Sequence, residues 1–285
     1  MRGKSKKVPV RPVKLDEEFA DVPRLFAHDG DLIVSHVVAA LSSVFPDGED
    51  FFVRSVRHYK DRIEDPELNA AVLGFIGQEV THGREHRAFN AHLDSLGYHT
   101  KFVERLTRRG IAFRERHSPA IANLASTAAL EHFTATLAEL VMTSEETRES
   151  FGHEAVRNLF LWHALEEAEH KAVAFDVYQA VGGGERLRIL MMKIARYAFV
   201  VSMSIQVILG LLLDRETYKP GRLRKSLAYT RKQPLFSRES WNQLKAYERK
   251  GFHPDDRPTG DLVELWRERL FGVDGAMTES VRGAA

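Results

Sequence analysis

The sequence contains no cysteine among its 285 residues. This absence excludes disulfides, thiolate zinc sites, iron–sulfur clusters and thiol catalysis. Any bound metal ion must therefore use histidine, aspartate or glutamate, and the chain has 13 histidines. The net charge is also small, +1 from 41 Lys and Arg against 40 Asp and Glu. A dedicated nucleic-acid binder carries a larger positive charge, so we expect no nucleic-acid partner.

Patterns that indicate β-strands are missing as well. Apolar residues recur every three or four positions over long windows, which predicts helices. The basic segment 1–30 has no apolar run typical of a secretory signal, so we expect a solvated tail and a cytoplasmic protein. The predicted fold is all-α: a ferritin-like four-helix bundle at residues 31–184, then a helical C-terminal extension at 185–285.

Prolines and glycines set the expected helix ends. Pro46 and Gly48 predict that one helix ends near Phe45 and that another begins near Asp47. Asp65 before a proline is a typical helix start. The other helices of the bundle are expected at residues 66–96, 119–142 and 154–181.

One segment, residues 197–213, reads YAFVVSMSIQVILGLLL and has no charge over 17 residues. As a helix it spans about 25 Å, slightly short for a bilayer. Many basic residues follow it. A buried core or dimer helix, a helix on an anionic membrane surface and a true span are the open alternatives. We expect one face to cover the bundle and the other to form a homodimer contact or a membrane contact.

Two short motifs place carboxylates and imidazoles on the same helix face. Glu79 and His82 form one Glu-x-x-His pair, and Glu167 and His170 form another. Residues three apart lie about 60° apart around a helix, so each pair can point at one metal ion. His163 precedes Glu167 by four residues and shares its face. One such pair is commonplace, but two in this order predict a metal site.

Two isolated glutamates complete the expected ligand set. Glu131 lies among small and apolar residues, where a carboxylate is costly to bury unless it is paired or binds a cation. On the preceding helix we choose Glu49, with His58 as the other candidate. Two Glu-x-x-His helices with two further glutamates form the bundle site for two iron or manganese ions. The expected hydrogen-bond partners of the ligands are His86, Glu166 and Asp176.

The predicted ligand order resembles that of the ferritin-like di-iron N-oxygenases of the p-aminobenzoate N-oxygenase type. That group has one histidine more than other ferritin-like proteins, and His163 matches its position. The stretches FPDGEDFF, QEVTHGREHRAFN, ALEHFTA and WHALEEAEHKAVAFDVY resemble more closely a bacterial family named "predicted metal-dependent hydrolase", over residues 34–213. The resemblance implies two metal ions, iron or alternatively manganese or zinc. The long apolar stretch after Gly184 departs from the N-oxygenases.

Three functions follow from this ligand set. The first hypothesis is a di-iron oxygenase that uses dioxygen to oxidise a small apolar or amine substrate. The alternatives are a dinuclear metal-dependent hydrolase and a non-catalytic metal-binding protein or ferroxidase. Seven protein ligands favour redox iron, whereas hydrolytic metal pairs more often use Asp- and His-rich loops. The extra C-terminal third speaks against a metal-storage cage. No catalytic residue is predicted beyond the metal ligands.

Overall fold

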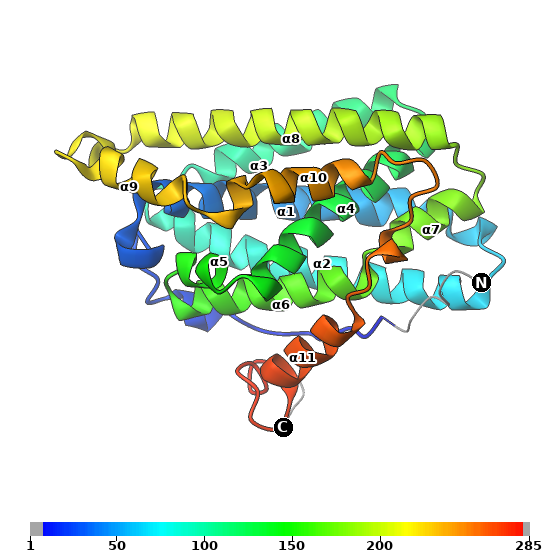
Figure 1. Cartoon of the computed structure of the whole chain (residues 1–285), viewed down its shortest axis with the longest axis horizontal. Coiled ribbons are helices and arrows are strands. Elements are labelled where there is room, and N and C mark those ends of the chain that lie inside the picture. Colours follow the sequence, from blue (N-terminus) through cyan, green and yellow to red (C-terminus); the bar gives the residue numbers. More distant parts are fainter. Residues whose placement is uncertain (1–7, 282–285) are drawn as a thin grey trace.

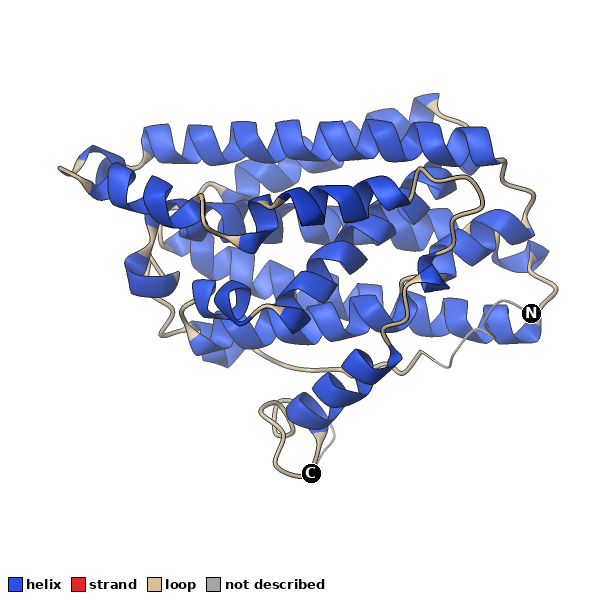
Figure 2. Cartoon of the chain, in the orientation of Figure 1, coloured by secondary structure: helices blue, strands red, loops and turns tan. Residues whose placement is uncertain are grey.

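The structure is a computed structural model and describes residues 8–281. Within this range the chain consists of helices and loops, without a β-strand (Figure 2). The α-helices are α1 (Leu32–Arg57), α2 (Pro66–Ser95), α3 (Thr100–His117), α4 (Ala120–Thr143), α5 (Glu145–Ser150), α6 (Glu154–His170), α7 (Val173–Ala180), α8 (Glu185–Leu213), α9 (Arg222–Thr230), α10 (Arg238–Ala246) and α11 (Gly260–Phe271). These helices confirm the all-α fold.

The helices form a bundle with later helices on its outside (Figure 1). Helix α1 packs along α2, and α4 packs along α6 and α7. Helix α3, which the sequence did not indicate, lies against α1. Helix α8 packs on α4 and α1 and forms one long edge of the molecule (Figure 1). The boundary at residue 184 between a bundle domain and a C-terminal extension remains a prediction.

Helix α1 is continuous across Pro46, so the expected break near Phe45 is wrong. Proline has no N–H and leaves the carbonyl four residues earlier without its helical partner. Here that carbonyl belongs to Ser42, and it accepts a hydrogen bond from Nδ2 of Asn90 at 3.1 Å. A side chain of α2 therefore replaces the missing backbone donor, which a local sequence pattern cannot reveal.

The ends of the other helices agree with expectation in part. Asp65 caps α2 by accepting from two backbone N–H groups, and α4 covers the range expected from residue 119. The single helix expected at residues 154–181 is two helices, α6 and α7, separated by a turn at residues 171–172. The three predicted ligands of this region, His163, Glu167 and His170, all lie on α6.

The N-terminal segment is not the solvated tail that we expected. Residues 1–7 lie outside the described residues, but Val13, Leu15 and Phe19 are buried in the core beside α6. The basic residues of this segment alternate with apolar ones, and the apolar ones fill grooves on the bundle. We call residues 8–15 the N-terminal strap. It runs beneath α6 in Figure 1 and pairs with the C-terminal segment through Val13 and Val281.

Two apolar clusters make up the core, and α2 passes through both. Phe75 belongs to one cluster, together with residues of α4 and α7. Phe89 belongs to the other, together with residues of α6 and the N-terminal segment. The polar residues of the Glu-x-x-His motif on α2 lie between these two phenylalanines in the sequence. The core therefore encloses the motif from both ends.

Candidate metal centre

Seven buried side chains from four helices point into one interior space. We call them the ligand cluster, and each is at most 4% exposed. Its members are Glu49 on α1, Glu79 and His82 on α2, Glu131 on α4, and His163, Glu167 and His170 on α6. The structure thus brings together every residue that the sequence predicted as a ligand. Their role in binding metal stays a prediction.

The ligand cluster divides into two groups that could each hold one ion. In the first, one atom each of Glu49, His82 and His163 lies within 4.8 Å of the others. The second contains Glu79, Glu167 and His170 at the same spacing. Glu131 joins the second group, since its Oε2 is 3.4 Å from Nε2 of His170.

Glu167 lies between the two groups. Its Oε1 is 3.1 Å from Nε2 of His163 in the first group and 3.5 Å from Nε2 of His170 in the second. The same oxygen is 3.9 Å from Nδ1 of His82. Glu167 would therefore be available as a ligand to an ion in either group.

The ligand cluster fits bound cations because many of its buried polar atoms have no hydrogen-bond partner. Both carboxylate oxygens of Glu49, Glu79 and Glu131 are of this kind, as are Nδ1 of His82 and Nε2 of His170. A buried carboxylate without a partner is costly, and native proteins leave few such groups unsatisfied. Metal ions would satisfy all of them at once. Oxygen and imidazole ligands suit iron, manganese and zinc.

Burial and mutual repulsion shift the pKa values of the carboxylates. Burial, with repulsion from neighbouring glutamates, raises the pKa of Glu49 and of Glu79 well above the ordinary value. The same two causes raise the pKa of Glu131 to about 7. Burial also acts to raise the pKa of Glu167, but the adjacent His170 and His163 outweigh it and hold that pKa well below the ordinary value. Without metal, the cluster therefore retains protons that a cation would displace.

The imidazoles respond to the same surroundings. Burial, reinforced by the neighbouring His163, lowers the pKa of His82 and of His86 well below the ordinary value. Burial acts to lower the pKa of His170 too, but three nearby glutamates outweigh it and raise that pKa well above the ordinary value. A neutral imidazole is the form that binds a metal ion, and the lowered pKa keeps His82 in this form at neutral pH.

A chain of hydrogen bonds fixes the orientation of His163. Its Nδ1 lies 2.7 Å from Nε2 of His86, whose Nδ1 lies 2.9 Å from the hydroxyl of Ser42. That hydroxyl donates to the side-chain amide oxygen Oδ1 of Asn90 at 2.7 Å and so accepts from His86. Neutral His86 then accepts from Nδ1 of His163. In the neutral imidazole with its proton on Nδ1, Nε2 of His163 would carry the lone pair that a metal ion in the ligand cluster needs.

The N-terminal strap supports His82 from outside the cluster. Nε2 of His82 lies 3.1 Å from one oxygen of Glu166, and Arg11 donates to the other oxygen at 3.1 Å. Arg11 also donates two hydrogen bonds of 2.8 Å to Glu169. No pattern in the sequence connects Arg11 with the site, because 155 residues separate it from Glu166.

The remaining candidate residues differ in whether they contact the ligand cluster. Asp176 accepts from His253 at 2.8 Å, whereas His86 and Glu166 contact ligands as expected. His58 is exposed at the end of α1. His132 is partly buried and hydrogen-bonds to the carbonyl of Gln243 at 3.0 Å, outside the ligand cluster.

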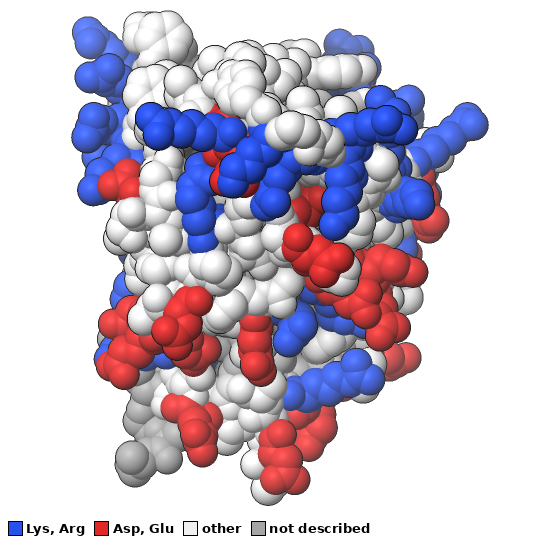
Figure 3. Space-filling model, turned by 90° about the vertical axis from the view of Figure 1, so that its left-hand side faces the viewer, with Lys and Arg blue, Asp and Glu red and all other residues white. Residues whose placement is uncertain are grey.

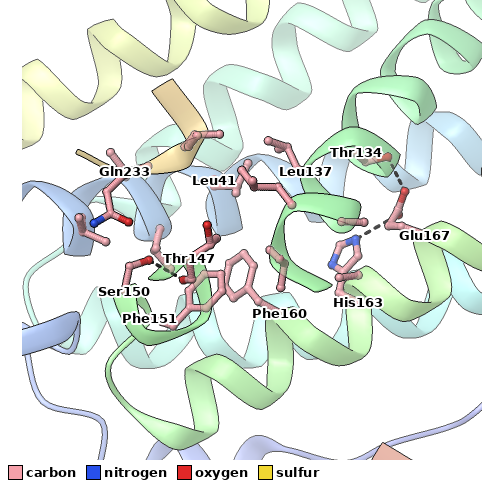
Figure 4. A pocket seen from close by; sticks show the side chains of 18 of the residues that line it. Leu41, Thr134, Leu137, Thr147, Ser150, Phe151, Phe160, His163, Glu167 and Gln233 are labelled. Atoms are coloured by element: carbon pink, nitrogen blue, oxygen red, sulfur yellow. Dashed lines mark hydrogen bonds and ion pairs between the residues drawn. The ribbon is translucent and has the colours of Figure 1, made fainter. Parts of the chain in front are cut away.

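An apolar cavity reaches the ligand cluster from the side of α1, α4 and α6. His163 and Glu167 form its inner end, and Gln233 lies at the opposite end (Figure 4). Its volume is about 110 Å³. The remaining walls are mainly leucine, valine and phenylalanine side chains. Thr134 of the same wall donates a hydrogen bond to Glu167. A small apolar molecule therefore has a path to two members of the cluster.

A family model described as "Predicted metal-dependent hydrolase" matches residues 9–257. The chain belongs to this family. No curated protein and no solved structure matches the chain. Membership of the predicted metal-dependent hydrolases agrees with the buried Glu and His groups and with the resemblance in residues 34–213. The comparisons do not support the resemblance to the N-oxygenases.

Proposed function

We propose that the protein is a metal-dependent enzyme that acts on a small apolar substrate at a centre of two metal ions. The observation that carries this proposal is that His163 and Glu167 belong to two features at once. Both belong to the ligand cluster, and both form the inner end of the apolar cavity. A substrate in that cavity would lie next to the ions. The two ions would supply Lewis acidity for hydrolysis or, as Fe(II), electrons for oxidation by dioxygen.

Hydrolysis is the reaction class that the family description favours. In this reaction the side chains of the cavity would bind the apolar part of an ester or amide and exclude bulk water. Thr134 would hold the carboxylate of Glu167 in place through its hydrogen bond.

Oxidation by dioxygen is the second candidate, favoured by the ligand pattern. Two Glu-x-x-His pairs with single glutamates from two other helices are the arrangement of di-iron and di-manganese carboxylate proteins. The apolar cavity also suits this chemistry, because within the described residues its only ionisable lining groups are His163 and Glu167. The cavity thus offers no separate charged group to bind a polar substrate.

The decisive experiment compares the two reactions in one preparation. Metal-free protein is loaded with Fe(II) without oxygen, exposed to oxygen, and followed by oxygen uptake and visible absorption. A second sample is loaded with Zn(II) or Mn(II) and given nitrophenyl esters of increasing chain length. Ester cleavage without oxygen uptake supports hydrolysis, and the reverse result supports oxidation. Absence of both reactions would contradict an enzymatic role.

A cavity variant tests the position of the substrate. Leu137→Phe narrows the cavity at a residue of α4 that lies outside the ligand cluster. We expect it to lower activity and to leave the metal content unchanged. The matched control is Leu73→Ala, because Leu73 is exposed on α2. Equal activity of both variants would place the substrate elsewhere.

A further inference from the structure

The outer face of α8 is an exposed apolar surface. Of the described helices, α8 alone is long and apolar enough to cross a membrane, yet only 11% of its most apolar window is buried. Its large exposed side chains are Leu190, Ile194, Tyr197, Val200, Val201, Ile205, Ile208, Leu209, Leu212 and Leu213. Apolar patches of this kind are unusual on a soluble monomer and mark interaction sites. The sequence predicted this exposure.

Helix α3 extends the same surface. Phe102 and Leu106 of α3 line a groove together with Ile205, Leu209 and Leu213 of α8. The side chains of Phe102 and Leu106 are about as exposed as the outward side chains of α8. We call the outward sides of these two helices the α3/α8 face. It is broader than one helix and therefore suits a flat partner better than a narrow peptide.

Basic residues surround the α3/α8 face. Residues 100–117, which form α3, contain six Lys and Arg and two Asp and Glu. Residues 214–232, which follow α8, contain seven basic and two acidic residues. The whole chain has a net charge of only +1, so the rest of it is acidic. Figure 3 shows this separation: Lys and Arg gather around an apolar upper surface, and Asp and Glu gather mainly in the lower half.

Helix α8 is held along the bundle and does not project from it. Met191, Met192 and Arg196 are buried, and Nη1 of Arg196 is 2.6 Å from a carboxylate oxygen of Glu248. A bilayer span would have to separate this ion pair and expose the arginine to lipid, which is costly. The helix can therefore meet a membrane with its outer face while its inner face stays on the protein.

We propose that the α3/α8 face docks on the surface of an anionic membrane. Its apolar side chains would enter the boundary between headgroups and acyl chains, as interfacial helices do. The surrounding lysines and arginines would attract the anionic headgroups. A second copy of the chain fits less well, because it would present the same excess of positive charge. This proposal does not depend on the metal chemistry.

The test is flotation of the full-length chain with vesicles of phosphatidylcholine, alone or mixed with phosphatidylglycerol, at low and high salt. We expect binding to the mixed vesicles that weakens with salt. The double variant Arg224→Glu and Lys225→Glu should reduce binding about tenfold. The triple change of Ile205, Ile208 and Leu212 to serine should reduce it about 100-fold.

The control is Leu73→Ser, a similarly exposed leucine on α2 that should leave binding unchanged. Circular dichroism and melting curves verify that each variant folds. Size-exclusion chromatography with light scattering, without detergent, measures the oligomeric state. Failure to bind either kind of vesicle would overturn the proposal, as would a dimer that the triple serine variant dissociates and that binds no vesicles. Insertion that only detergent reverses would also overturn it and indicate a span.

Discussion

Nδ1 of His170 donates a hydrogen bond to Oε1 of Gln78 over 2.7 Å. The direction of this bond is fixed because Nε2 of Gln78 donates to the carbonyl of Pro9 at 2.8 Å and to Glu169 at 2.9 Å. The amide oxygen is thus left to accept, so Nδ1 of His170 carries the proton. In the neutral imidazole Nε2 of His170 would then present its lone pair to the ligand cluster, and because the pKa of His170 is raised, a metal ion must displace a proton from this nitrogen. Such outer partners commonly orient the histidines of metal sites.

Replacing Gln78 by leucine should therefore weaken metal binding. We expect affinity for Fe(II), Mn(II) and Zn(II) to fall about 10- to 100-fold, since His170 loses the partner that fixes its tautomer. Titration of metal-free protein by isothermal calorimetry measures the change. Gln179→Leu is the matched control, because Gln179 is exposed at the end of α7. If both variants bind metal equally well, Gln78 does not orient the site.

The sequence predicted five members of the ligand cluster because they lie at helical spacing within two motifs, whereas Glu49 and Glu131 stand alone on their helices. His163, Glu167 and His170 share a face on α6, and that relation depends only on residues a few positions apart. Gln78 next to Glu79 was also visible as a polar residue in an apolar helix, but its partner His170 is 92 residues away. Contacts between helices depend on packing, so a local pattern cannot supply them.

The contacts of the N-terminal strap are the clearest example of structure that the sequence alone does not predict. Its basic residues were consistent with a solvated tail. In the structure Arg11 contacts two glutamates of α6, and Gly74 and Gly77 leave room on α2 for Val8 and Val10. Nothing in the sequence around Gly74 and Gly77 indicates that Val8 and Val10 pack on them. The same holds for Asn90, whose amide compensates for Pro46 across two helices.

Arg11→Ala should destabilise the protein and weaken metal binding together. Its guanidinium is mostly buried against Glu166 and Glu169, and its removal leaves two buried carboxylates without their main cation. We expect the free energy of unfolding to fall by about 2–4 kcal/mol, measured by urea denaturation. Arg57→Ala, at an exposed arginine of α1, should change it by less than about 0.5 kcal/mol. Unchanged stability and affinity would show that Arg11 contributes neither to folding nor to metal binding.

Glu169→Ala should show the same two effects in smaller measure. Glu169 lies two residues after Glu167, about 200° further around α6, and therefore faces away from the ligand cluster. Its carboxylate contacts Arg11, Arg267 and Gln78 instead. Because Gln78 holds His170, we expect affinity to fall severalfold. Calorimetry of this variant and of Gln78→Leu under the same conditions provides the comparison. Unchanged affinity of the Glu169→Ala variant would show that Glu169 does not influence His170 through Gln78.

Glu131→Gln should change stability and metal binding in opposite directions. The metal-free cluster crowds four glutamates, and their repulsion with burial raises the pKa of Glu131 to about 7. Removing one charge should raise the melting temperature of the metal-free protein by a few degrees, in line with about 1 kcal/mol. It should also abolish the stabilisation that Fe(II) or Mn(II) gives the unchanged protein. Stabilisation by metal in this variant would show that Glu131 is not a ligand.

Metal binding should release protons and tighten as the pH rises toward and through about 7. The pKa values of Glu49 and Glu79 are raised, and that of Glu131 is about 7, so these carboxyls hold protons that the ions must displace. Calorimetry in two buffers of different ionisation enthalpy measures the release. The release should fall toward zero once the pH exceeds the raised pKa values. Affinity independent of pH between about 5 and 8 would contradict a carboxylate-rich site.

The ion pair of His253 and Asp176 should make stability depend on pH without affecting metal binding. The hydrogen bond to Asp176 raises the pKa of His253, although partial burial opposes it. A raised pKa in the folded state means that the stabilisation is complete below about pH 6.5, the ordinary histidine value, and is lost as the pH rises through the folded-state pKa. Asp255 and Asp256 also face this imidazole and support the same sign. Asp176→Asn should remove this part of the pH dependence in urea denaturation, and its affinity for metal should equal that of the unchanged protein. A loss of affinity would instead place Asp176 among the outer partners of the site, where the sequence put it.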